Sequence, residues 1–366
     1  MPADRLRITI ALAGIHRVPR GAEVALEAIG AGLGARGHDV TLIGSGPTRD
    51  GKPYAYRRAP VVDRERFARW PPVRPIRQET GYEALTFVPG LLARYRPASC
   101  DVTMTCGFPF ENVALRRPHL GGRPRHVFVT QNGDWPALVD RGEARLFSCD
   151  GLVCTNPVYL ERNQARWPSV LIPNAIDADR FLPGPPQRAE LDLPADVPIV
   201  LMVSALIPSK RVDAGVKAVA ALDDAVLVVA GSGPQSESID ALGASLLGPR
   251  YIRRSFTFDQ MPALYNSTDV LFHPTLQESF GNVYVEAMAC GTAVVAHRST
   301  VTEWIVGRHG ALIDTADHEA TVAALREAID SPTDAAAGRD RVLDEFTWDQ
   351  VAVRYERFLT DVVGAD

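Results

Sequence analysis

Short apolar runs that end in glycine or a turn residue alternate with helical segments along most of the chain. The first run, LRITIALAG at residues 6–14, has the character of a buried parallel strand. AEVALEAIGAGLGARG at residues 22–37 follows it with helical spacing, and HDVTLIGSG at residues 38–46 is strand-like again. This alternation is typical of α/β domains built on a parallel, doubly wound sheet.

The alternation restarts after a segment rich in proline and charge at residues 181–198. Since a chain of 366 residues exceeds one ordinary domain, we predict two facing Rossmann-like domains with a deep cleft between them. The predicted parts are an N-terminal domain over 1–180, a linker over 181–196, a C-terminal domain over 197–345 and an amphipathic helix over 346–366 that crosses back to the N-terminal domain.

Composition narrows the classes of function. The net charge of −5 gives no reason to expect a nucleic-acid partner. No apolar run reaches the eighteen residues of a spanning helix. The five cysteines are odd in number and form no C-x-x-C pair, which favours a reducing cytoplasm.

One segment departs from this average charge. Residues 49–77 hold nine Lys or Arg against three Asp or Glu, interleaved with aromatic residues. Such a segment can bind an anionic acceptor or a membrane surface. We favour the simpler interpretation of a solvated, arginine-rich insertion, and we expect residues 46–89 to be irregular with short helices.

Three glycine-rich sites are candidates for phosphate binding. GAGLGARG at residues 30–37 lies deep in a helical run rather than directly after a strand, so we interpret it as close helix packing. Gly21 lies between the first strand and the first helix, where backbone N–H groups either bind an anion or form an ordinary turn. Gly231 and Gly233 end a later strand, where a plain turn is the favoured interpretation.

The segment from His273 to Gly291 carries the most chemistry. A strand ends near its start, a loop carries Glu278, and a helix begins near Gly281. The first amides of that helix can hold a diphosphate. Glu286 lies inside the otherwise apolar run VYVEAMACG, and because a buried carboxylate without a partner is costly, this position favours a ligand with hydroxyl groups.

With these residues in place, the sequence resembles the family 4 retaining glycosyltransferases of the GT-B fold. Their signature is Glu, seven residues, Glu and then Ala-Met-Ala-x-Gly, which Glu278 to Gly291 match. Further matches are PNAID at 173–177, SALIPSKRVD at 204–213 and AGSGP at 230–234. The resemblance implies a nucleotide-sugar donor held by the C-terminal domain and a hydroxyl acceptor held by the N-terminal one.

The resemblance also implies roles for individual residues. Glu278 would contact hydroxyls of the donor sugar, Glu286 those of the ribose, and Lys210 the diphosphate. Catalytic roles fall on Glu278, Lys210 and Asn132. The implied donor-binding residues are Gly21, Lys210, Arg211, Gly231, Gly233, Tyr251, Ile252, Glu278, Ser279, Phe280, Gly281, Asn282, Val283 and Glu286. Tyr251 and Ile252 lie where the family holds the base.

Three positions depart from the family pattern, and the mildest is PNAID at 173–177 in place of PNGVD. Ala205 stands where an arginine usually binds the diphosphate, and Arg211 is the residue that could partly replace it. Asn132 stands where a catalytic histidine is usual, so its contact must be that of a neutral amide. No D-x-D motif follows a strand in a way that suggests a metal site.

The expected reaction is therefore transfer of a sugar from a nucleoside diphosphate sugar, UDP- or GDP-linked, with retention of configuration and without a metal or other cofactor. The acceptor is a small molecule, a glycan or a glycolipid, and a membrane surface is possible but not favoured. Two alternatives stay open: a GT-B phosphorylase or epimerase, and a noncatalytic protein that binds nucleotide sugars.

Overall fold

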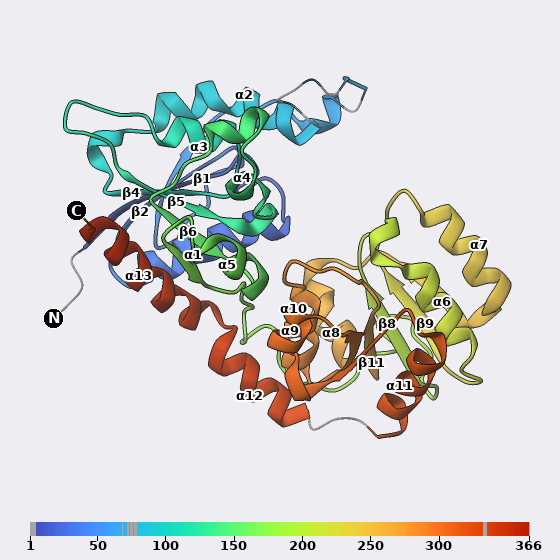
Figure 1. The fold of residues 1–366 in the computed structure, drawn as a ribbon. Coiled ribbons are helices and arrows are strands. Elements are labelled where there is room, and N and C mark those ends of the chain that lie inside the picture. Colours follow the sequence, from blue (N-terminus) through green and yellow to red (C-terminus); the bar gives the residue numbers. More distant parts are fainter. Residues whose placement is uncertain are drawn as a thin grey trace. The chain divides into compact units, whose positions relative to one another are not determined.

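The computed structural model describes residues 5–67, 69–71, 73, 76, 79–331 and 335–365, and it divides the chain into two compact units. Unit 1 is drawn from the chain up to Asn174 and from Trp348 onward, and unit 2 is Ala175–Thr347. Residues 181–196, which the composition predicts as a linker, lie within unit 2. Each unit contains one parallel β-sheet with helices on both faces (Figure 1).

The sheet of unit 1 has the strand order β3-β2-β1-β4-β5-β6-β7, and every neighbouring pair is parallel. Its strands are β1 (Arg7–Ala11), β2 (Asp39–Gly44), β3 (Ala55–Arg58), β4 (Val102–Thr105), β5 (Arg125–Val129), β6 (Gly151–Cys154) and β7 (Ser169–Leu171). The direction of the strand order changes between β1 and β4. Doubly wound folds bind ligands in the crevice at the carboxyl ends of the two strands that flank such a switch point.

Helices cover both faces of this sheet. They are α1 (Gly21–Ala35), α2 (Glu79–Arg94), α3 (Phe110–Leu115), α4 (Trp135–Leu138), α5 (Pro157–Asn163) and α13 (Trp348–Gly364). α2 and α3 lie on one face, and α1 and α13 lie together on the other (Figure 1).

The glycines of α1 confirm the packing interpretation of residues 30–37. A Cβ on Gly30 would lie 2.6 Å from Leu42 Cδ1, and one on Gly32 would lie 2.8 Å from the Cβ of Ala352 on α13. A Cβ on Gly34 would overlap the carbonyl oxygen of Pro53. Small residues therefore let α1 approach both its own sheet and the last helix of the chain.

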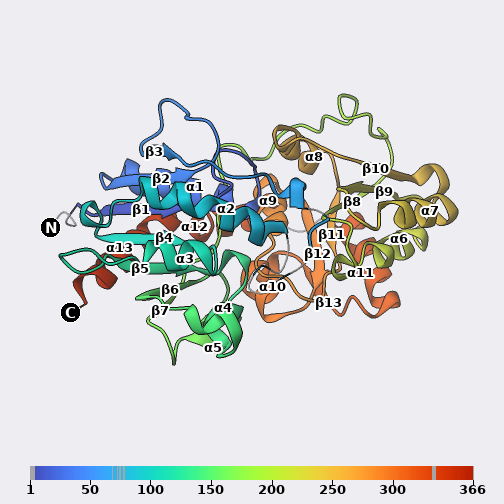
Figure 2. The same ribbon diagram turned by 90° about the horizontal axis from the view of Figure 1, so that it is seen from above.

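The sheet of unit 2 has the order β10-β9-β8-β11-β12-β13 and is also parallel throughout. Its strands are β8 (Ile199–Val203), β9 (Val226–Ala230), β10 (Tyr251–Arg254), β11 (Val270–His273), β12 (Ala293–His297) and β13 (Ala311–Ile313). Its helices are α6 (Val212–Ala220), α7 (Ser236–Leu246), α8 (Met261–Asn266), α9 (Asn282–Cys290), α10 (Thr300–Ile305), α11 (His318–Asp330) and α12 (Ala335–Glu345). Figure 2 shows α6, α7 and α11 on one side of the sheet and α9 on the other.

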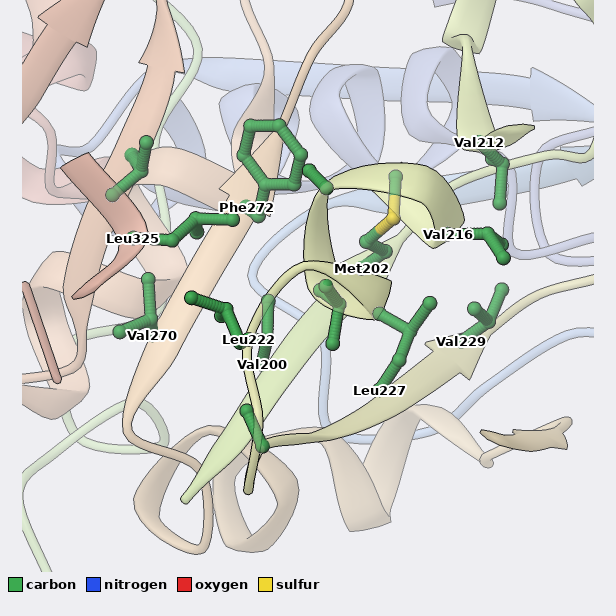
Figure 3. Close-up of a cluster of buried hydrophobic side chains, with 14 of the residues drawn as sticks. Val200, Met202, Val212, Val216, Leu222, Leu227, Val229, Val270, Phe272 and Leu325 are labelled. Carbon is green, nitrogen blue, oxygen red and sulfur yellow. The ribbon is translucent and has the colours of Figure 1, made fainter. Parts of the chain in front are cut away.

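The apolar core of unit 2 explains why its strands are almost continuously hydrophobic. Val200 and Met202 from β8 meet Val216 from α6, and Phe272 from β11 meets Leu325 from α11 (Figure 3). All five side chains are buried. Because parallel strands covered on both faces bury both sets of side chains, the alternation of a half-exposed strand is absent.

The segment at residues 46–89 is more regular than the sequence predicts. It contains β3, and α2 continues through Pro89 to Arg94 although proline removes one helical hydrogen bond. The basic stretch at 49–77 is only partly within the described residues. Two of its described arginines bind other residues of unit 1: Arg49 pairs with Glu27, and Arg58 donates a hydrogen bond to the carbonyl oxygen of Ser45.

Candidate functional site

The loop between β11 and α9 presents Glu278 beside the N-terminus of a helix. Gly281 precedes α9 with a φ of +79°, and a Cβ there would lie 2.5 Å from the ring of Tyr284, so only glycine fits. Phe280 is buried and packs edge-on against Trp304 and Phe346. These contacts fix the loop, so that the first amides of α9, from Asn282 and Val283, form its positive end.

Glu278 lies at the centre of a small charged cluster. Its Oε2 accepts a hydrogen bond from Lys210 Nζ at 2.5 Å and lies 3.1 Å from His273 Nε2, while Oε1 accepts from the backbone N–H of Ser279 at 3.0 Å. Burial raises the pKa of Glu278, but the hydrogen bond to His273 and the charge of Lys210 outweigh it and lower the pKa to about 2. Glu278 is therefore ionised at neutral pH and accepts hydrogen bonds.

Lys210 reaches this cluster from the 3₁₀ turn Pro208–Lys210, which precedes α6. The sequence predicts that Lys210 and Glu278 share one site, and the structure brings them together. Arg211, the neighbouring candidate, lies elsewhere: its guanidinium donates to the carbonyl oxygen of Pro274 at 3.0 Å and to Thr315 Oγ1 at 2.9 Å. Arg211 thus holds the loop after β11 in place, and its proposed contact with a diphosphate stays a prediction.

The glycine-rich turn after β9 supports the loop that leads to Lys210. A Cβ on Gly231 would overlap the carbonyl oxygen of Ser204, and one on Gly233 would lie 2.5 Å from that of Leu206. Ala205, where the family pattern has an arginine, is exposed between these two residues. Close backbone packing therefore requires both glycines, and their contact with the donor stays a prediction.

Glu286 lies about one turn into α9, on the helix whose N-terminus follows Gly281. Its Oε2 accepts a hydrogen bond from the buried Tyr265 hydroxyl at 2.7 Å. Burial raises the pKa of Glu286, and the hydrogen bond from Tyr265 opposes this rise. One carboxylate oxygen is thus fixed by the protein, which orients the group for a ligand hydroxyl.

Tyr251 and Ile252 lie on β10, the edge strand of the unit 2 sheet. The ring of Tyr251 packs over Gly243 on α7, and its hydroxyl donates to Asp240 Oδ1 at 3.0 Å. The Tyr251 side chain is therefore held against α7. The predicted contact of Tyr251 and Ile252 with the base stays a prediction.

In unit 1 a cavity of about 670 Å³ opens at the carboxyl ends of β1, β4 and β5. Gly21 and Asn132 both line it, so the structure brings these two predicted residues together. A Cβ on Gly21 would meet no atom within 4 Å, so this glycine leaves open space at the N-terminus of α1. Asn132 is exposed, and its Nδ2 lies 3.7 Å from Cys106 Sγ.

Sequence reasoning missed three acidic residues that line the same cavity: Glu23, Glu83 and Glu111. Glu83 is bonded to Arg20, whereas Glu111 is 1% exposed and its Oε2 has no hydrogen-bond partner among the described residues. Burial raises the pKa of Glu111 to about 7. Glu23 and Glu111 each lie in an apolar helical run, and this signal, which drew attention to Glu286, could have found them.

Within the described ranges, no group of three or more His, Cys, Asp or Glu side chains is arranged to hold a metal ion. None of the helices in these ranges is long and apolar enough to cross a membrane. The candidate residues therefore form two groups: Lys210, Glu278, Glu286 and the start of α9 in unit 2, and the cavity that contains Gly21 and Asn132 in unit 1.

Comparison with known proteins shows what this chain is similar to. Residues 185–341 match the model of the glycosyl transferases group 1 family. The chain is 30% identical over 211 residues to a GDP-mannose-dependent alpha-(1-6)-phosphatidylinositol monomannoside mannosyltransferase of Mycolicibacterium smegmatis, covering 52% of this chain and 55% of the relative. It is 32% identical over 224 residues to a D-inositol 3-phosphate glycosyltransferase of Salinispora tropica, covering 52% of this chain and 44% of the relative. The chain thus spans about half the length of these relatives.

The fold is similar to solved structures over the full chain. Sucrose-phosphate synthase of Thermosynechococcus elongatus superimposes with a TM-score of 0.80 at 22% identity and covers 99% of this chain and 100% of its own. The predicted fold class, two parallel Rossmann-like domains, is confirmed. Residues 185–341, within unit 2, therefore match the glycosyl transferases group 1 model, and the chain has the GT-B fold.

Proposed function

We propose that this chain transfers a sugar from a nucleoside diphosphate sugar to an acceptor hydroxyl, with retention of configuration and without a metal ion. The observation that carries the proposal is the Lys210–Glu278 pair beside the N-terminus of α9. A cation and a helix N-terminus attract a diphosphate, while an ionised carboxylate attracts hydroxyl groups. A nucleotide sugar presents both chemical groups at adjacent positions.

The donor fits unit 2 in a definite orientation. Glu286, fixed by Tyr265, accepts hydrogen bonds from the ribose hydroxyls, and Glu278 accepts them from the sugar. The Mycolicibacterium smegmatis relative is named as GDP-mannose-dependent, so GDP-mannose is the first donor to test, with UDP sugars second. The acceptor binds in the unit 1 cavity lined by Gly21 and Asn132.

The chemical step relies on electrostatic stabilisation of the leaving group. Lys210 and the amides at the start of α9 stabilise the charge that develops on the departing diphosphate. Glu278, with its pKa near 2, holds no proton to give at neutral pH. In a front-face substitution the departing phosphate oxygen takes the acceptor's proton, so that no protein nucleophile is needed. We place the reaction in the cytoplasm, since the five cysteines are all free and buried.

A panel of GDP-, UDP-, ADP- and TDP-linked sugars tests the proposal by thermal shift and by release of free sugar. A donor at 100 times its dissociation constant should stabilise the protein by about 2.7 kcal/mol. Glu286→Ala should lower the affinity for the free nucleoside diphosphate on the order of 10–100-fold, because a charged hydrogen bond to ribose is lost. Glu319→Ala, an exposed glutamate of α11, is the matched control. Wild-type nucleotide affinity in Glu286→Ala would contradict the ribose assignment, and no shift with any donor would overturn the proposal.

Activity should also persist without divalent metal. Because Lys210 and backbone amides supply the positive charge, we expect the rate of sugar transfer to stay within about twofold when EDTA is added. The measurement compares the initial rate in EDTA with rates after Mg²⁺ or Mn²⁺ is restored. A rate that collapses in EDTA and recovers with either metal would exclude this mechanism.

A further inference from the structure

Two carboxyl side chains at the base of the unit 1 cavity each occupy the space left by a glycine. A Cβ on Gly14, after β1, would overlap Glu23 Oε1, and a Cβ on Gly107, after β4, would lie 2.7 Å from Glu111 Oε2. Glu23 comes from α1 and Glu111 from α3, so two helices and two strand ends build one feature. Any larger residue at either glycine would displace a carboxyl group from the cavity wall.

Among the described residues, one of these two carboxyl groups has an oxygen without a partner, and the other has a long ion pair. Glu23 is 6% exposed and Glu111 is 1% exposed, and both line the cavity. Within the described part of the chain, Glu111 Oε2 has no hydrogen-bond partner, and the nearest ion pair of Glu23 is Arg20 at 3.5 Å. Burial raises the pKa of both groups. An unsatisfied buried acid costs free energy that a ligand hydroxyl would recover.

The charges around the pair disfavour an anion at this place. Glu83 from α2 and the Cys106 thiol face Glu111, and Glu83 also faces Glu23. Arg17 and Arg20 both bind Glu83, and Arg64, which also lines the cavity, pairs with Glu65. Each of these cations already has a carboxylate partner, so a phosphate group beside Glu23 and Glu111 would compete for it, whereas hydroxyl groups would find acceptors.

We propose that Glu23 and Glu111 determine acceptor specificity by binding the ring hydroxyls of an uncharged polyol. This inference rests on the proposed glycosyltransferase function and specifies which chemical group of the acceptor reaches the base of the cavity. An acceptor that also carries a phosphate would bind with its hydroxyl face toward the two glutamates and with the phosphate away from them. The pair is assigned to the acceptor alone, so the donor KM should not depend on it.

The test uses myo-inositol and methyl α-D-mannopyranoside as neutral probes, and inositol 3-phosphate and mannose 6-phosphate as their anionic counterparts. With the donor selected by the nucleotide panel, the neutral member of each pair should have the lower KM. Glu111→Gln keeps the size of the side chain and removes its charge, so it should raise the KM for the neutral probes about 10-fold while the donor KM stays unchanged. Glu161→Gln, an exposed glutamate on α5, is the matched control.

A pH profile separates acceptor binding from a merely structural role. Hydroxyl donors favour the ionised carboxylate, so the KM for the neutral probes should fall as pH rises through about 7, the pKa of Glu111. Glu111→Gln should remove this dependence, and a thermal melt shows that the variant is folded. Glu23→Gln is a second, independent variant, for which we expect the same rise in the KM for the neutral probes.

Three outcomes overturn the inference: lower KM values for the phosphate-bearing probes, no binding or turnover of either neutral probe, or unchanged acceptor KM and pH profile in both variants. Each of these leaves the proposed function standing, provided that the wild-type protein still binds and hydrolyses a nucleotide sugar. Failure of nucleotide-sugar binding instead defeats the proposed function itself. The two failures are therefore distinguishable in the same set of measurements.

Discussion

Replacing Glu278 by glutamine should lower kcat on the order of 100-fold or more while the affinity for the free nucleoside diphosphate stays nearly unchanged. The sugar ring gains positive character as its bond to phosphate breaks, so a carboxylate beside it stabilises the transition state more than the ground state. Glutamine keeps the size of the side chain and removes the charge. Steady-state kinetics and calorimetry with the free diphosphate, which has no sugar, measure the two effects separately.

The negative charge of Glu278 also stabilises the folded protein, so the kinetic comparison needs a control for lost stability. Its pKa of about 2 lies below the ordinary 4.5, so its contribution is complete above that ordinary value and is lost as pH falls toward 2. At neutral pH the contribution is about 3 kcal/mol at most. Kinetics of Glu278→Gln should therefore be measured well below the melting temperature of this variant. Glu190→Gln, at an exposed glutamate, is the control. A wild-type kcat in a folded Glu278→Gln protein would defeat the site assignment.

Replacing Lys210 by methionine should reduce both binding and turnover. We expect the affinity for the nucleoside diphosphate to fall on the order of 10-fold and kcat/KM on the order of 1000-fold, because the charge is needed most when the diphosphate leaves. Methionine keeps most of the length of the side chain and removes its charge. Calorimetry gives the first number and initial rates at low donor concentration give the second.

The chain offers a close control for this substitution. Of its 39 basic residues only three are lysines, and Lys217 lies on α6, exposed and paired with Asp213. Lys217→Met should leave donor binding and rate unchanged. If the two lysine variants behave alike, the diphosphate does not bind at Lys210. A loss of binding without a further loss of kcat would assign Lys210 to substrate holding alone.

Local sequence signals predicted the elements that depend on neighbours in the chain. The apolar runs ending in glycine predicted the strands, and the spacing of the segment after His273 predicted the loop of Glu278 and the start of α9. The position of the glycines inside a helical run predicted the close packing of α1. In each case the residues that determine the element and the element itself lie in one segment of the chain.

Features that depend on distant segments were not predictable in this way. Arg211 donates to Thr315, 104 residues later, and no spacing rule predicts that its guanidinium turns toward that loop. Glu111 lies beside Glu23 only because β1 and β4 are neighbours in the sheet, although 94 residues separate Ile8 from Val102. The sheet must be assembled before such carboxyl groups can be recognised as a pair.

Because α13 packs on α1, unit 1 cannot complete its fold during synthesis until the segment that follows unit 2 has been made. Unit 2 is continuous, so all of its residues are synthesised before the last helix. Unit 1 begins first but finishes last: until Trp348–Gly364 emerge, the side of α1 that receives Ala352 and the end of β6 that receives Phe358 are exposed to solvent. A nascent chain that ends within unit 2 therefore lacks part of both units. The apolar face that it exposes is a natural target for chaperones.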